Sequence, residues 1–507
     1  MKSLFFDTRV LDDRIKNEFC LTEDILMENA AMSLEERIRI FCNSLNDKYL
    51  HKVDVLIVCG SGDNGADGLV LARRLKNKVF NNLLIEPCVF QVLSPKSNGC
   101  KTQRKRAEKI GVKFVENIFD AHIVVDCLFG SGFHGKLDKN MKNLIDSLNL
   151  LKGFKLACDV PSALDCAIKG EGNAFVAEET VTMGARKISL FLDDAKDYTG
   201  KIITASLGIS DSVFEDTFTS DAFLLEESDL KLPSRKFMNV HKGCFGHTAV
   251  VAGNKKGAAL IAASAAFRFG AGLVSLIDFS KEKSGFNVPS EFMISEFLPK
   301  NATALALGMG LGQENCDFEP YLDLLKNENL PVVLDADIFY YENLPEILSL
   351  RSRLNAKTII TPHPKEFAVL LKNCGLADVS SIDIQKNRLD YAKTFCNFYK
   401  NIVLILKGST SIICLHSKKA NCFESYFNPH GLSNLSKGGS GDVLSGLAAA
   451  LLAQNWNAKA AAIQSSLAHA LASKKAAQKF SSYALTPQLL IDEISLLEIN
   501  FEQIRQF

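Results

Sequence analysis

The sequence predicts two α/β domains, of which the N-terminal one is built on a parallel sheet that helices cover on both faces. Its 507 residues exceed what one ordinary hydrophobic core supports, so we expect two domains. In both halves, short apolar segments alternate with helical patterns and several of them end in glycine-rich turns. A polar, acidic stretch over 208–234 separates the halves. We place the boundary near residue 218, with domains at 1–218 and 225–507.

Composition excludes several classes of function. The formal net charge is zero and 23% of the residues are charged, so we expect neither nucleic acid nor an anionic membrane as a partner. The 14 cysteines include no C-x-x-C pair, which argues against a zinc site and for thiols in a reducing compartment. We find no signal peptide and no apolar run of membrane-spanning length. We therefore expect a soluble, cytoplasmic protein.

The N-terminal half alternates strand and helix patterns. Apolar segments predict strands at 53–59, 83–92, 122–125 and 154–158, and helical patterns lie at 26–32, 69–75 and 101–110. The first strand runs into the glycine-rich turn 60–68 and then a helix, an arrangement that binds a dinucleotide or a phosphate. A tight turn without a ligand is the alternative for such a loop taken alone.

Polar residues follow three of these strands at the point where each strand ends. They are Asn64, Asp126, Asp159 and Ser162. In an open α/β sheet the carboxyl ends of the strands form the binding crevice. Each residue alone could be a cap or a turn residue, but their common placement favours a site.

Four segments of this half resemble the NAD(P)H-hydrate epimerase domain. They are MENA at 27–30, CGSGDNGADGLV at 59–70, DCLFGSG at 126–132 and DVPS at 159–162. The family has a Rossmann-like three-layer α/β/α sandwich and interconverts the R and S forms of hydrated NADH and NADPH. The chain departs from the usual pattern at Asp63, where Asn is common, and at Ala66 and Ala163, where Gly is common.

The resemblance implies roles for individual residues. Asp159 matches a catalytic carboxylate that also binds the ligand, and Asn64, Asp126 and Ser162 match the ligands of a potassium ion. The other positions that match substrate-binding residues are Asp63, Asn64, Gly65, Ala66 and Asp67 in the first turn, and Gly130, Ser131, Gly132, Phe133, His134, Gly135 and Lys136 in the second.

The C-terminal half shows the same alternation. We expect strands at 248–252, 304–307, 331–334, 358–361 and 402–406, an Ala-rich helix over 258–272 and a further helix over 443–453. Alternating glycines follow the second strand and carboxylates the third. His363 stands between two prolines, which restrict the backbone around it. Lys407, Gly408 and three hydroxyl residues follow the last strand, a composition suited to phosphate oxygens.

The segment 434–446 contains the C-terminal residue that we single out for chemistry. In it Asp442 directly follows Gly438, Gly439, Ser440 and Gly441 and precedes a helix. Glycines let backbone N–H groups approach an anion, and the positive end of the helix favours it. Asp442 would be a base beside such a phosphate site, although a carboxylate in a first helical turn can also act only on the helix dipole.

This half resembles the ribokinase-like superfamily, and more closely the ADP-dependent NAD(P)H-hydrate dehydratase domain. The resemblance rests on 241–243, 257–259, 308–312, 334–337, 361–364, 406–408 and 438–444. It implies a ribokinase-like α/β/α domain in which the catalytic Asp442 lines the hydrated nicotinamide site with Ala258, Gly310 and His363. The nucleotide would contact Lys407, Gly408, Ser409, Thr410, Ser411 and Gly441. Ile338 departs from the Gly usual after the Asp-Ala-Asp segment.

Together the two resemblances imply a fused, bifunctional enzyme of metabolite repair. The first domain would epimerise the hydrate, and the second would dehydrate the S form with ADP as phosphoryl donor. We expect K⁺ in the epimerase site, Mg²⁺ with the nucleotide, hydrated NADH or NADPH and ADP as ligands, and a homo-oligomer. The alternatives are a kinase of a small, vitamin-like alcohol with an accessory N-terminal domain, and a non-catalytic nucleotide sensor.

Overall fold

A computed structural model describes residues 1–45, 50–133, 135–215, 219–279, 287–312, 318–417 and 421–497. The chain divides into two compact units, Ser3–Asp221 and Ala222–Phe507, the latter together with Met1–Lys2. The predicted boundary at residue 218 lies just outside the described residues.

The first unit is an α/β/α sandwich whose main sheet has the strand order β10-β8-β7-β6-β2-β4-β3, with β5 beside β4. The strands are parallel except for the short β3. A separate parallel pair joins β1 to β9. The elements are β1 (Lys2–Phe5), α1 (Arg9–Glu18), α2 (Glu23–Ser44), β2 (Lys52–Cys59), α3 (Asp63–Leu75), β3 (Val79–Phe80), β4 (Leu83–Gln91), α4 (Asn98–Lys109), β5 (Lys113–Val115), β6 (Ile123–Cys127), α5 (Lys139–Leu150), β7 (Phe154–Cys158), α6 (Leu164–Ile168), β8 (Glu179–Met183), β9 (Arg186–Lys187), η1 (Ile188–Phe191), α7 (Lys196–Thr199), β10 (Lys201–Ala205) and α8 (Asp211–Glu215).

The central strand β2 shows why this sequence folds into three layers. Val55 and Ile57 belong to the hydrophobic core beneath α2 and α3, whereas Leu56 and Val58 belong to the core on the opposite face, with Ile145 of α5. Successive side chains of a strand point to opposite faces, so a continuous apolar run must be covered twice. The strands predicted at 53–59, 83–92, 122–125 and 154–158 are confirmed as β2, β4, β6 and β7.

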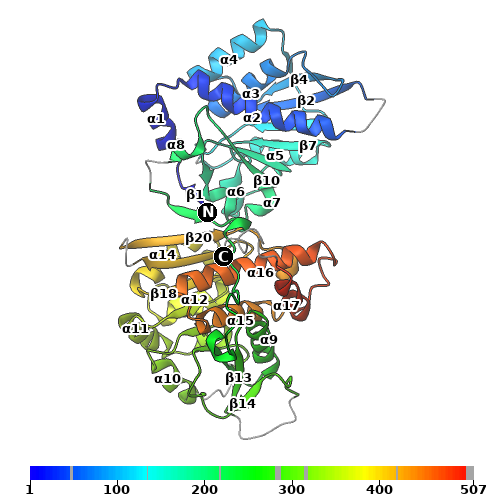
Figure 1. The fold of residues 1–507 in the computed structure, drawn as a ribbon. Coiled ribbons are helices and arrows are strands. Elements are labelled where there is room, and N and C mark those ends of the chain that lie inside the picture. The colour runs from blue at the N-terminus through cyan, green and yellow to red at the C-terminus, as the bar shows by residue number, and fades with distance from the viewer. Residues whose placement is uncertain are drawn as a thin grey trace. The chain divides into compact units, whose positions relative to one another are not determined.

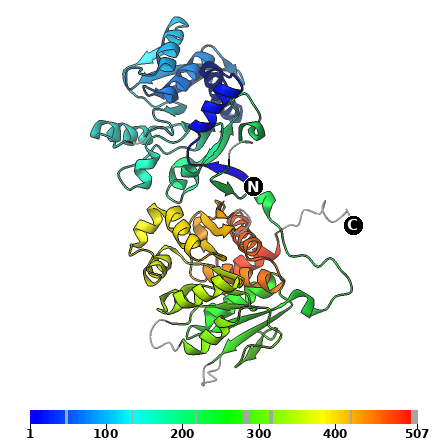
Figure 2. The same cartoon turned by 90° about the vertical axis from the view of Figure 1, so that its left-hand side faces the viewer.

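The second unit has the strand order β14-β13-β12-β15-β16-β17-β18-β19-β20-β11. Both ribbon views show these strands lying among helices (Figures 1 and 2). The elements are β11 (Ala222–Leu224), η2 (Glu227–Asp229), η3 (Lys242–Phe245), β12 (His247–Ala252), α9 (Lys256–Arg268), β13 (Leu273–Asp278), β14 (Met293–Ser295), β15 (Ala304–Leu307), α10 (Glu319–Lys326), β16 (Val332–Leu334), η4 (Ala336–Tyr340), α11 (Leu344–Leu354), β17 (Thr358–Ile360), α12 (Pro364–Asn373), α13 (Ser381–Lys386), α14 (Arg388–Phe398), β18 (Ile402–Leu406), β19 (Ser411–Ser417), β20 (Cys422–Asn428), η5 (Ser433–Leu435), α15 (Ser440–Ala453), α16 (Ala458–Ala477) and α17 (Pro487–Ser495).

The second sheet combines parallel and antiparallel strands. The strands from β14 to β18 pair in parallel, but β18, β19 and β20 form an antiparallel meander. The chain turns back directly after β18 instead of crossing over through a helix. The turn that holds Lys407 and Gly408 therefore stays at the carboxyl end of β18, beside the ends of the parallel strands.

Small residues let α9 and α15 pack closely against each other. A Cβ atom placed on Gly446 of α15 would lie 2.2 Å from the carbonyl oxygen of Ala262 on α9. Only glycine permits this backbone approach. The Ala-rich faces of both helices are buried in one core, so the start of α15 has a fixed position over the sheet.

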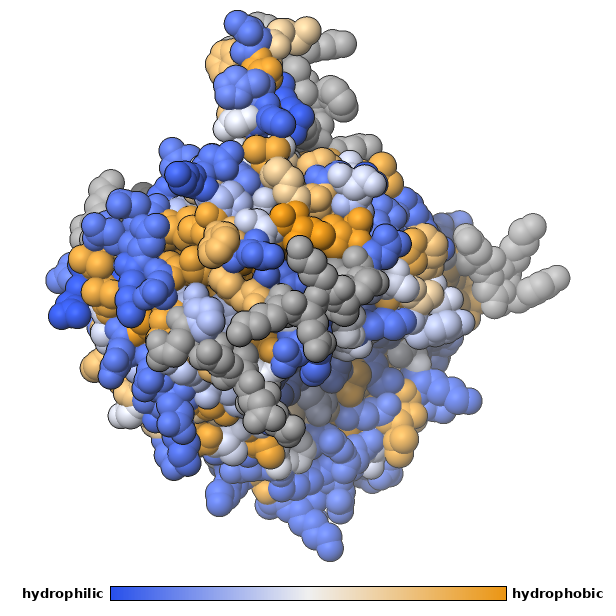
Figure 3. Space-filling view, turned by 90° about the horizontal axis from the view of Figure 1, so that it is seen from below, coloured by the Kyte–Doolittle hydropathy of each residue, from blue (hydrophilic) through white to orange (hydrophobic). Residues whose placement is uncertain are grey.

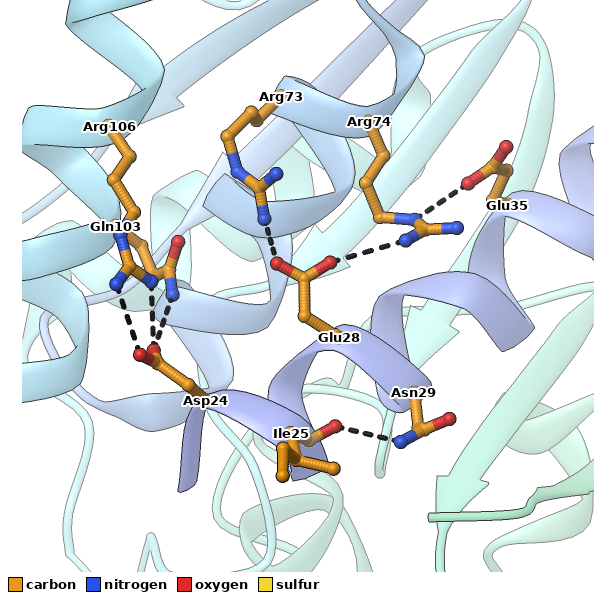
Figure 4. Close-up of polar contacts among 9 residues, drawn as sticks. All are labelled: Asp24, Ile25, Glu28, Asn29, Glu35, Arg73, Arg74, Gln103 and Arg106. Carbon is orange, nitrogen blue, oxygen red and sulfur yellow. Dashed lines mark hydrogen bonds and ion pairs between the residues drawn. The ribbon is translucent and has the colours of Figure 1, made fainter. Parts of the chain in front are cut away.

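A charged network joins three helices of the first unit (Figure 4). Glu28 of α2 accepts hydrogen bonds from Arg73 and Arg74 of α3, and Arg74 also donates to Glu35 at 2.7 Å. Asp24 of α2 binds Arg106 and Gln103 of α4. The Glu-Asn pair of the MENA segment, which by itself resembles an ordinary solvated face, thus places Glu28 where it ties α2 to α3.

The surface of the protein is mixed in character. Hydrophilic side chains alternate with smaller apolar groups over the face drawn in Figure 3. Among the described residues, no helix combines the length and the apolar character that crossing a membrane requires.

Replacement of Glu28 by Gln tests the network. Gln keeps the size of Glu but removes the negative charge that faces two guanidinium groups. We expect the variant to lose about 1 kcal/mol of unfolding free energy, the upper end of the range for partly exposed ion pairs. Thermal unfolding followed by circular dichroism measures the change. Glu36→Gln, which removes an exposed pair with Arg39 on the same helix, is the control, and an equal loss in both variants would contradict a special role for Glu28.

Candidate functional site

The first unit contains a cavity of about 520 Å³ at the carboxyl ends of its central strands. Its walls come from the loops that follow β2, β6 and β7, from helix α1, and from Lys187 at the end of β9. Loops that follow parallel strands meet at one edge of the sheet, which is where such folds bind ligands. The cavity is therefore the candidate site of this unit.

Most of the residues predicted to bind substrate line this cavity. They are Asp63, Asn64, Asp67, Gly130, Ser131, Gly132, Phe133 and Asp159. Gly65 and Ala66 are instead buried in the first turn of α3, and Gly135 and Lys136 lie on the exposed part of their loop. His134 lies outside the described residues.

Gly65 has a structural reason to be glycine. A Cβ atom there would lie 2.2 Å from the carbonyl oxygen of Gly60. The turn between β2 and α3 is too tight for any side chain at this position. Gly65 therefore shapes the turn that directs Asp63, Asn64 and Asp67 to the cavity.

Asp159 lies in the wall of the cavity, in a strained backbone conformation. Its φ angle is +70°, which is uncommon for a residue with a side chain. Lys187 Nζ donates to its Oδ1 at 2.7 Å, and the backbone N–H of Ser131 donates to its Oδ2 at 2.9 Å. Strain of this kind, held in place by surrounding contacts, is concentrated at functional sites.

Lys187 determines the charge state of Asp159. Burial acts to raise the pKa of Asp159, but the positive charge and hydrogen bond of Lys187, with the N–H of Ser131, outweigh it and leave that pKa below its ordinary value. Asp159 is therefore an ionised carboxylate at neutral pH. Both side chains of the pair are largely buried, so solvent screens their attraction weakly.

Of the three residues predicted to hold potassium, Asn64 lines the cavity, and the Ser162 hydroxyl donates to Asp126 at 2.6 Å. Asp126 is fully buried, and burial raises its pKa to about 6. Within the described residues, the donors to its carboxylate are neutral: the N–H and hydroxyl of Ser162 and the N–H of Leu128. The amide nitrogen of Asn64 is buried and lacks a partner in the described part of the chain.

Two further carboxyl groups line the same cavity. Burial raises the pKa of Asp12 to about 6 and that of Asp67 well above its ordinary value. Sequence reasoning found neither Asp12 nor Lys187 as site residues. Lys187 lies 28 residues beyond Asp159, on a two-residue strand, and Asp12 lies on an amphipathic helix without a motif. The strand pairing of β1 with β9 brings Lys187 to the site through the register of Phe5 with Lys187.

The candidate site of the second unit lies at the start of α15. The helix predicted over 443–453 is confirmed and begins at Ser440, which puts Asp442 in its first turn. Gly439 precedes it with a φ angle of +91°, and a Cβ atom there would lie 2.6 Å from Pro487. The first N–H groups of a helix are open to an anion.

A lysine lies opposite this helix start. Lys407 Nζ donates to Asp335 Oδ1 at 2.7 Å and lies 3.6 Å from Glu366. The other oxygen of Asp335 accepts from the Ser445 hydroxyl at 2.7 Å. A Cβ atom on Gly441 would lie 3.4 Å from Lys407 Nζ. The predicted nucleotide residues Lys407 and Gly441 are therefore neighbours, although Lys407 also has two acidic partners.

Asp442 is the unusual titrating group of this site. Burial, the negative charge of Asp335 and the lesser effects of other carboxylates raise its pKa to about 7, with Lys407 acting in the opposite direction. A general base works best when its pKa is near the operating pH. Simple interaction with a helix dipole would lower the pKa of a carboxyl group, so the shift favours a chemical role.

The remaining predicted residues surround this centre in different ways. His363 is the N-cap of α12, where its Nδ1 accepts from the N–H groups of Lys365 and Glu366. A Cβ atom on Gly310 would lie 3.1 Å from the Cβ of Ala258, so these two positions are adjacent. His363 thus has a structural function whatever else it contacts.

The turn after β18 holds the other predicted nucleotide residues. Gly408 and Ser409 are exposed, Thr410 is buried, and Ser411 begins β19. The buried Arg388 donates to the carbonyl oxygens of Leu406, Lys407 and Thr410 and so fixes the turn. Sequence reasoning missed this arginine, since it lies within an ordinary helical pattern.

Another residue that the sequence did not reveal supports the start of α15. His469 of α16 is buried, and its Nε2 lies 2.9 Å from the carbonyl oxygen of Ser440 and 3.1 Å from the Ser440 hydroxyl. Burial lowers the pKa of His469 to about 4. A neutral imidazole therefore holds the first residue of the helix.

The folds and sites define a two-domain α/β enzyme with a separate site at the carboxyl edge of each sheet. Residues 23–189 match the family described as YjeF-related protein N-terminus, and residues 248–496 match the family described as NAD(P)H-hydrate dehydratase.

Relatives match over both units. A bifunctional NAD(P)H-hydrate repair enzyme of Helicobacter pylori is 41% identical over 504 residues, which cover 98% of this chain and 100% of that protein. Its counterpart in Coxiella burnetii is 30% identical over 88% of this chain and 90% of its own. A solved ADP/ATP-dependent NAD(P)H-hydrate dehydratase of Bacillus subtilis, co-crystallised with ATP and Mg²⁺, is 24% identical with a TM-score of 0.44, over 54% of this chain and 96% of its own. The chain belongs to the family of bifunctional NAD(P)H-hydrate repair enzymes.

Replacement of Lys187 by Met tests the electrostatics of the first site. Met keeps the length of the side chain and removes the charge, so burial would dominate and the pKa of Asp159 would rise. At neutral pH the variant would bury an unpaired carboxylate, which costs about 3–5 kcal/mol of stability. The deficit would shrink as the pH falls, because protonated Asp159 needs no partner.

Thermal unfolding at several pH values, with the carboxyl pKa followed by NMR, measures both effects. Lys52→Met removes an exposed lysine that also pairs with carboxylates and is the control, for which we expect little change. A deficit in Lys187→Met that is the same at every pH would contradict the interpretation.

Proposed function

We propose that this chain repairs hydrated NADH and NADPH through two activities. Residues 1–218 form the domain that interconverts the R and S hydrates, and residues 225–507 form the domain that dehydrates the S hydrate with ADP, releasing AMP and phosphate. The observation that carries the proposal is the 41% identity with a bifunctional NAD(P)H-hydrate repair enzyme, which extends through both units.

In the first site we assign the role of base to Asp159. Its carboxylate is ionised by its pairing with Lys187 and lines the cavity. Inversion at C6 of the hydrated nicotinamide ring requires removal of the proton from the C6 hydroxyl, which a positioned carboxylate performs. The glycine-rich turn at 60–68 and the loop that resembles the family's phosphate loop, 130–136, are the segments that we assign to the phosphates of the ligand, and of the second loop the described residues 130–133 line the cavity.

A potassium ion fits the chemistry of Asn64, Asp126 and Ser162. Asp126 is a buried carboxylate with only neutral donors among the described residues, and a cation beside it would offset the cost of its charge. Asn64 and Ser162 add neutral oxygens, and this ligand type suits a weakly demanding monovalent ion. Such an ion would contribute positive charge and order to the loops that carry these residues.

In the second site we assign the role of base to Asp442. It removes the proton from the C6 hydroxyl of the S hydrate, and the oxygen attacks the terminal phosphorus of ADP, which releases AMP. The C6–O bond then breaks with the electron pair leaving on phosphate, assisted by the lone pair of N1. Loss of a proton from C5 restores the double bond. Phosphorylation replaces hydroxide by a far better leaving group.

The residues around Asp442 suit a nucleotide. Lys407 lies beside Gly441 at the helix start, so an ammonium group and helix N–H groups face the same space. Mg²⁺ usually keeps several waters and binds through one or two carboxylates and the phosphates. Glu366 fits that role, and the ion would neutralise phosphate charge during transfer. Ser409, Thr410 and Ser411 lie on the turn that Arg388 fixes.

We also propose that the enzyme works in the cytoplasm. Its described cysteines are free thiols and most of them are buried, which suits a reducing compartment. Assembly into a homo-oligomer stays a prediction.

Replacement of Asp159 by Asn tests the first activity. Asn retains the size but cannot accept the proton, so R-to-S exchange should fall by roughly 100-fold or more. Dehydration of pure S hydrate by the same preparation should stay unchanged. Exchange is followed by chromatography of the two epimers. Near-normal exchange would assign Asp159 a structural role only.

Replacement of Asp442 by Asn tests the second activity. ADP affinity, measured by calorimetry, should be kept or increased, because a negative charge near the phosphates is removed. The recovery of NADH absorbance from S hydrate should fall by roughly 100-fold or more, while epimerisation continues. Preserved turnover with a slightly lower melting temperature would show that Asp442 only interacts with the helix dipole.

A further inference from the structure

Asp12 on helix α1 lies at the junction of two cavities in the first unit. It lines the cavity of about 520 Å³ that contains Asp159, and also a smaller neighbouring cavity of about 150 Å³. Among the described residues, its carboxyl group accepts no hydrogen bond and pairs with no cation. A half-buried carboxyl group without a partner is costly to keep, so its presence calls for a function.

The groups around Asp12 act on its pKa in opposite directions. Burial raises its pKa to about 6, the charge of Lys187 acts against this, and Asp159 supports it. The other titratable groups that face it are Lys16 and Asp13 on its own helix, with Glu23, Asp63 and Asp67 across the smaller cavity. Asp12 and Asp159 therefore share one cavity with their pKa values moved in opposite directions, a pattern typical of an acid and a base.

Epimerisation needs both a proton donor and a proton acceptor. The hydroxyl oxygen at C6 must lose a proton on one face of the ring and gain one on the other. A single carboxylate positioned on one face serves only one of these transfers.

We propose that Asp12 is a second catalytic residue of the first site, giving a proton to the C6 oxygen on the face of the ring opposite Asp159. This inference rests on the proposed epimerase function. It extends the site to helix α1, which precedes residues 23–189 that match the family of the N-terminal domain.

The steps balance in atoms and electrons. Asp159 takes the hydroxyl proton, a C=O bond forms at C6, and the C6–N1 bond breaks with its electron pair moving to N1 and, through the C2=C3 bond, to the carboxamide. Rotation about C5–C6 turns the aldehyde. N1 then attacks C6 again, and the oxygen takes the proton of Asp12. The reverse reaction, or exchange with water, resets the two carboxyl groups.

Asp67 is the rival for this role, since it also lines both cavities. Its charged neighbours are all carboxylates, namely Asp159, Asp63 and Asp12, and burial raises its pKa well above the ordinary value. Burial and these negative charges favour the protonated form of Asp67, which can donate a hydrogen bond. Of the two, only Asp12 has its pKa lowered by the positive charge of Lys187, and this lets Asp12 release its proton and take it up again.

The test measures epimerisation by the full-length chain in Asp12→Asn, Asp12→Glu and Asp13→Asn. Asp13 is the adjacent, exposed carboxylate that pairs with Lys16 and is the matched control. We expect Asp12→Asn to lower kcat/KM for R-to-S exchange by roughly 100-fold or more, Asp12→Glu to restore part of it, and Asp13→Asn to leave it unchanged. Circular dichroism and thermal unfolding of the same samples show whether the first unit of each variant is folded, and unchanged dehydration of S hydrate shows that the second unit is intact.

The pH profile separates a catalytic from a structural role. In the wild type, kcat/KM for exchange should decline as the pH rises through about 6, where Asp12 loses its proton. This alkaline limb should vanish in Asp12→Asn and persist in Asp67→Asn. Loss of the limb in Asp67→Asn instead, or an unaltered rate and profile in Asp12→Asn, would overturn the proposal. Failure of the epimerase function itself would be distinct, because the wild type would then not exchange the epimers at all.

Discussion

The cost of placing carboxylates away from water governs both sites. In each unit one buried lysine bonds one carboxylate at 2.7 Å, Lys187 with Asp159 and Lys407 with Asp335. Near each lysine lies a second carboxyl group that the lysine does not bond. In the first unit this is Asp12, whose pKa is raised to about 6. In the second it is Asp442, whose pKa is raised to about 7. In the first unit the lysine thus keeps Asp159 ionised, and in both units its charge offsets part of the rise in the pKa of the neighbouring carboxyl group.

The two units use this arrangement differently. In the first, the paired Asp159 is the assigned base, and its low pKa keeps it available over a wide pH range. In the second, the paired Asp335 accepts from Lys407 and Ser445, and we assign the proton transfer to the unpaired Asp442, whose pKa is raised to about 7. A base with a pKa near 7 is strong enough to assist a hydroxyl group and is still partly ionised.

The sequence predicted the main strands and many of the residues that line the candidate sites, and the reason is physical. Strands such as β2 and β7 are apolar runs that must be covered on both faces, and their ends are marked by glycines and carboxylates. Lys187, Asp12 and Arg388 could not be predicted, because pairing of β1 with β9 and packing of remote helices bring them to the sites. The meander after β18 was also missed, since a short turn of Lys, Gly and hydroxyl residues fits a ligand loop and a hairpin equally well.

Two alanines near the sites adopt the left-handed backbone conformation, which has a definable cost. Ala163 stands where glycine is common, and its φ angle is +68°; Ala336 adopts +56° between Asp335 and Asp337. An alanine in this region costs of order 1 kcal/mol relative to glycine. Ala163 follows Ser162, which bonds Asp126, and Ala336 follows Asp335, which bonds Lys407. These neighbouring contacts hold the backbone in a conformation that is unfavourable for alanine.

The chemistry explains why two independent sites suffice in one chain. Epimerisation exchanges two forms of similar energy and needs only an acid and a base, whereas dehydration is coupled to cleavage of a phosphoanhydride and removes the S form in one direction. Mass action then draws the R form through the first site without any conformational signal between units. Each site can therefore be complete within its own unit. The residues of the first candidate site lie between Thr8 and Lys187, and those of the second lie between Ala258 and His469.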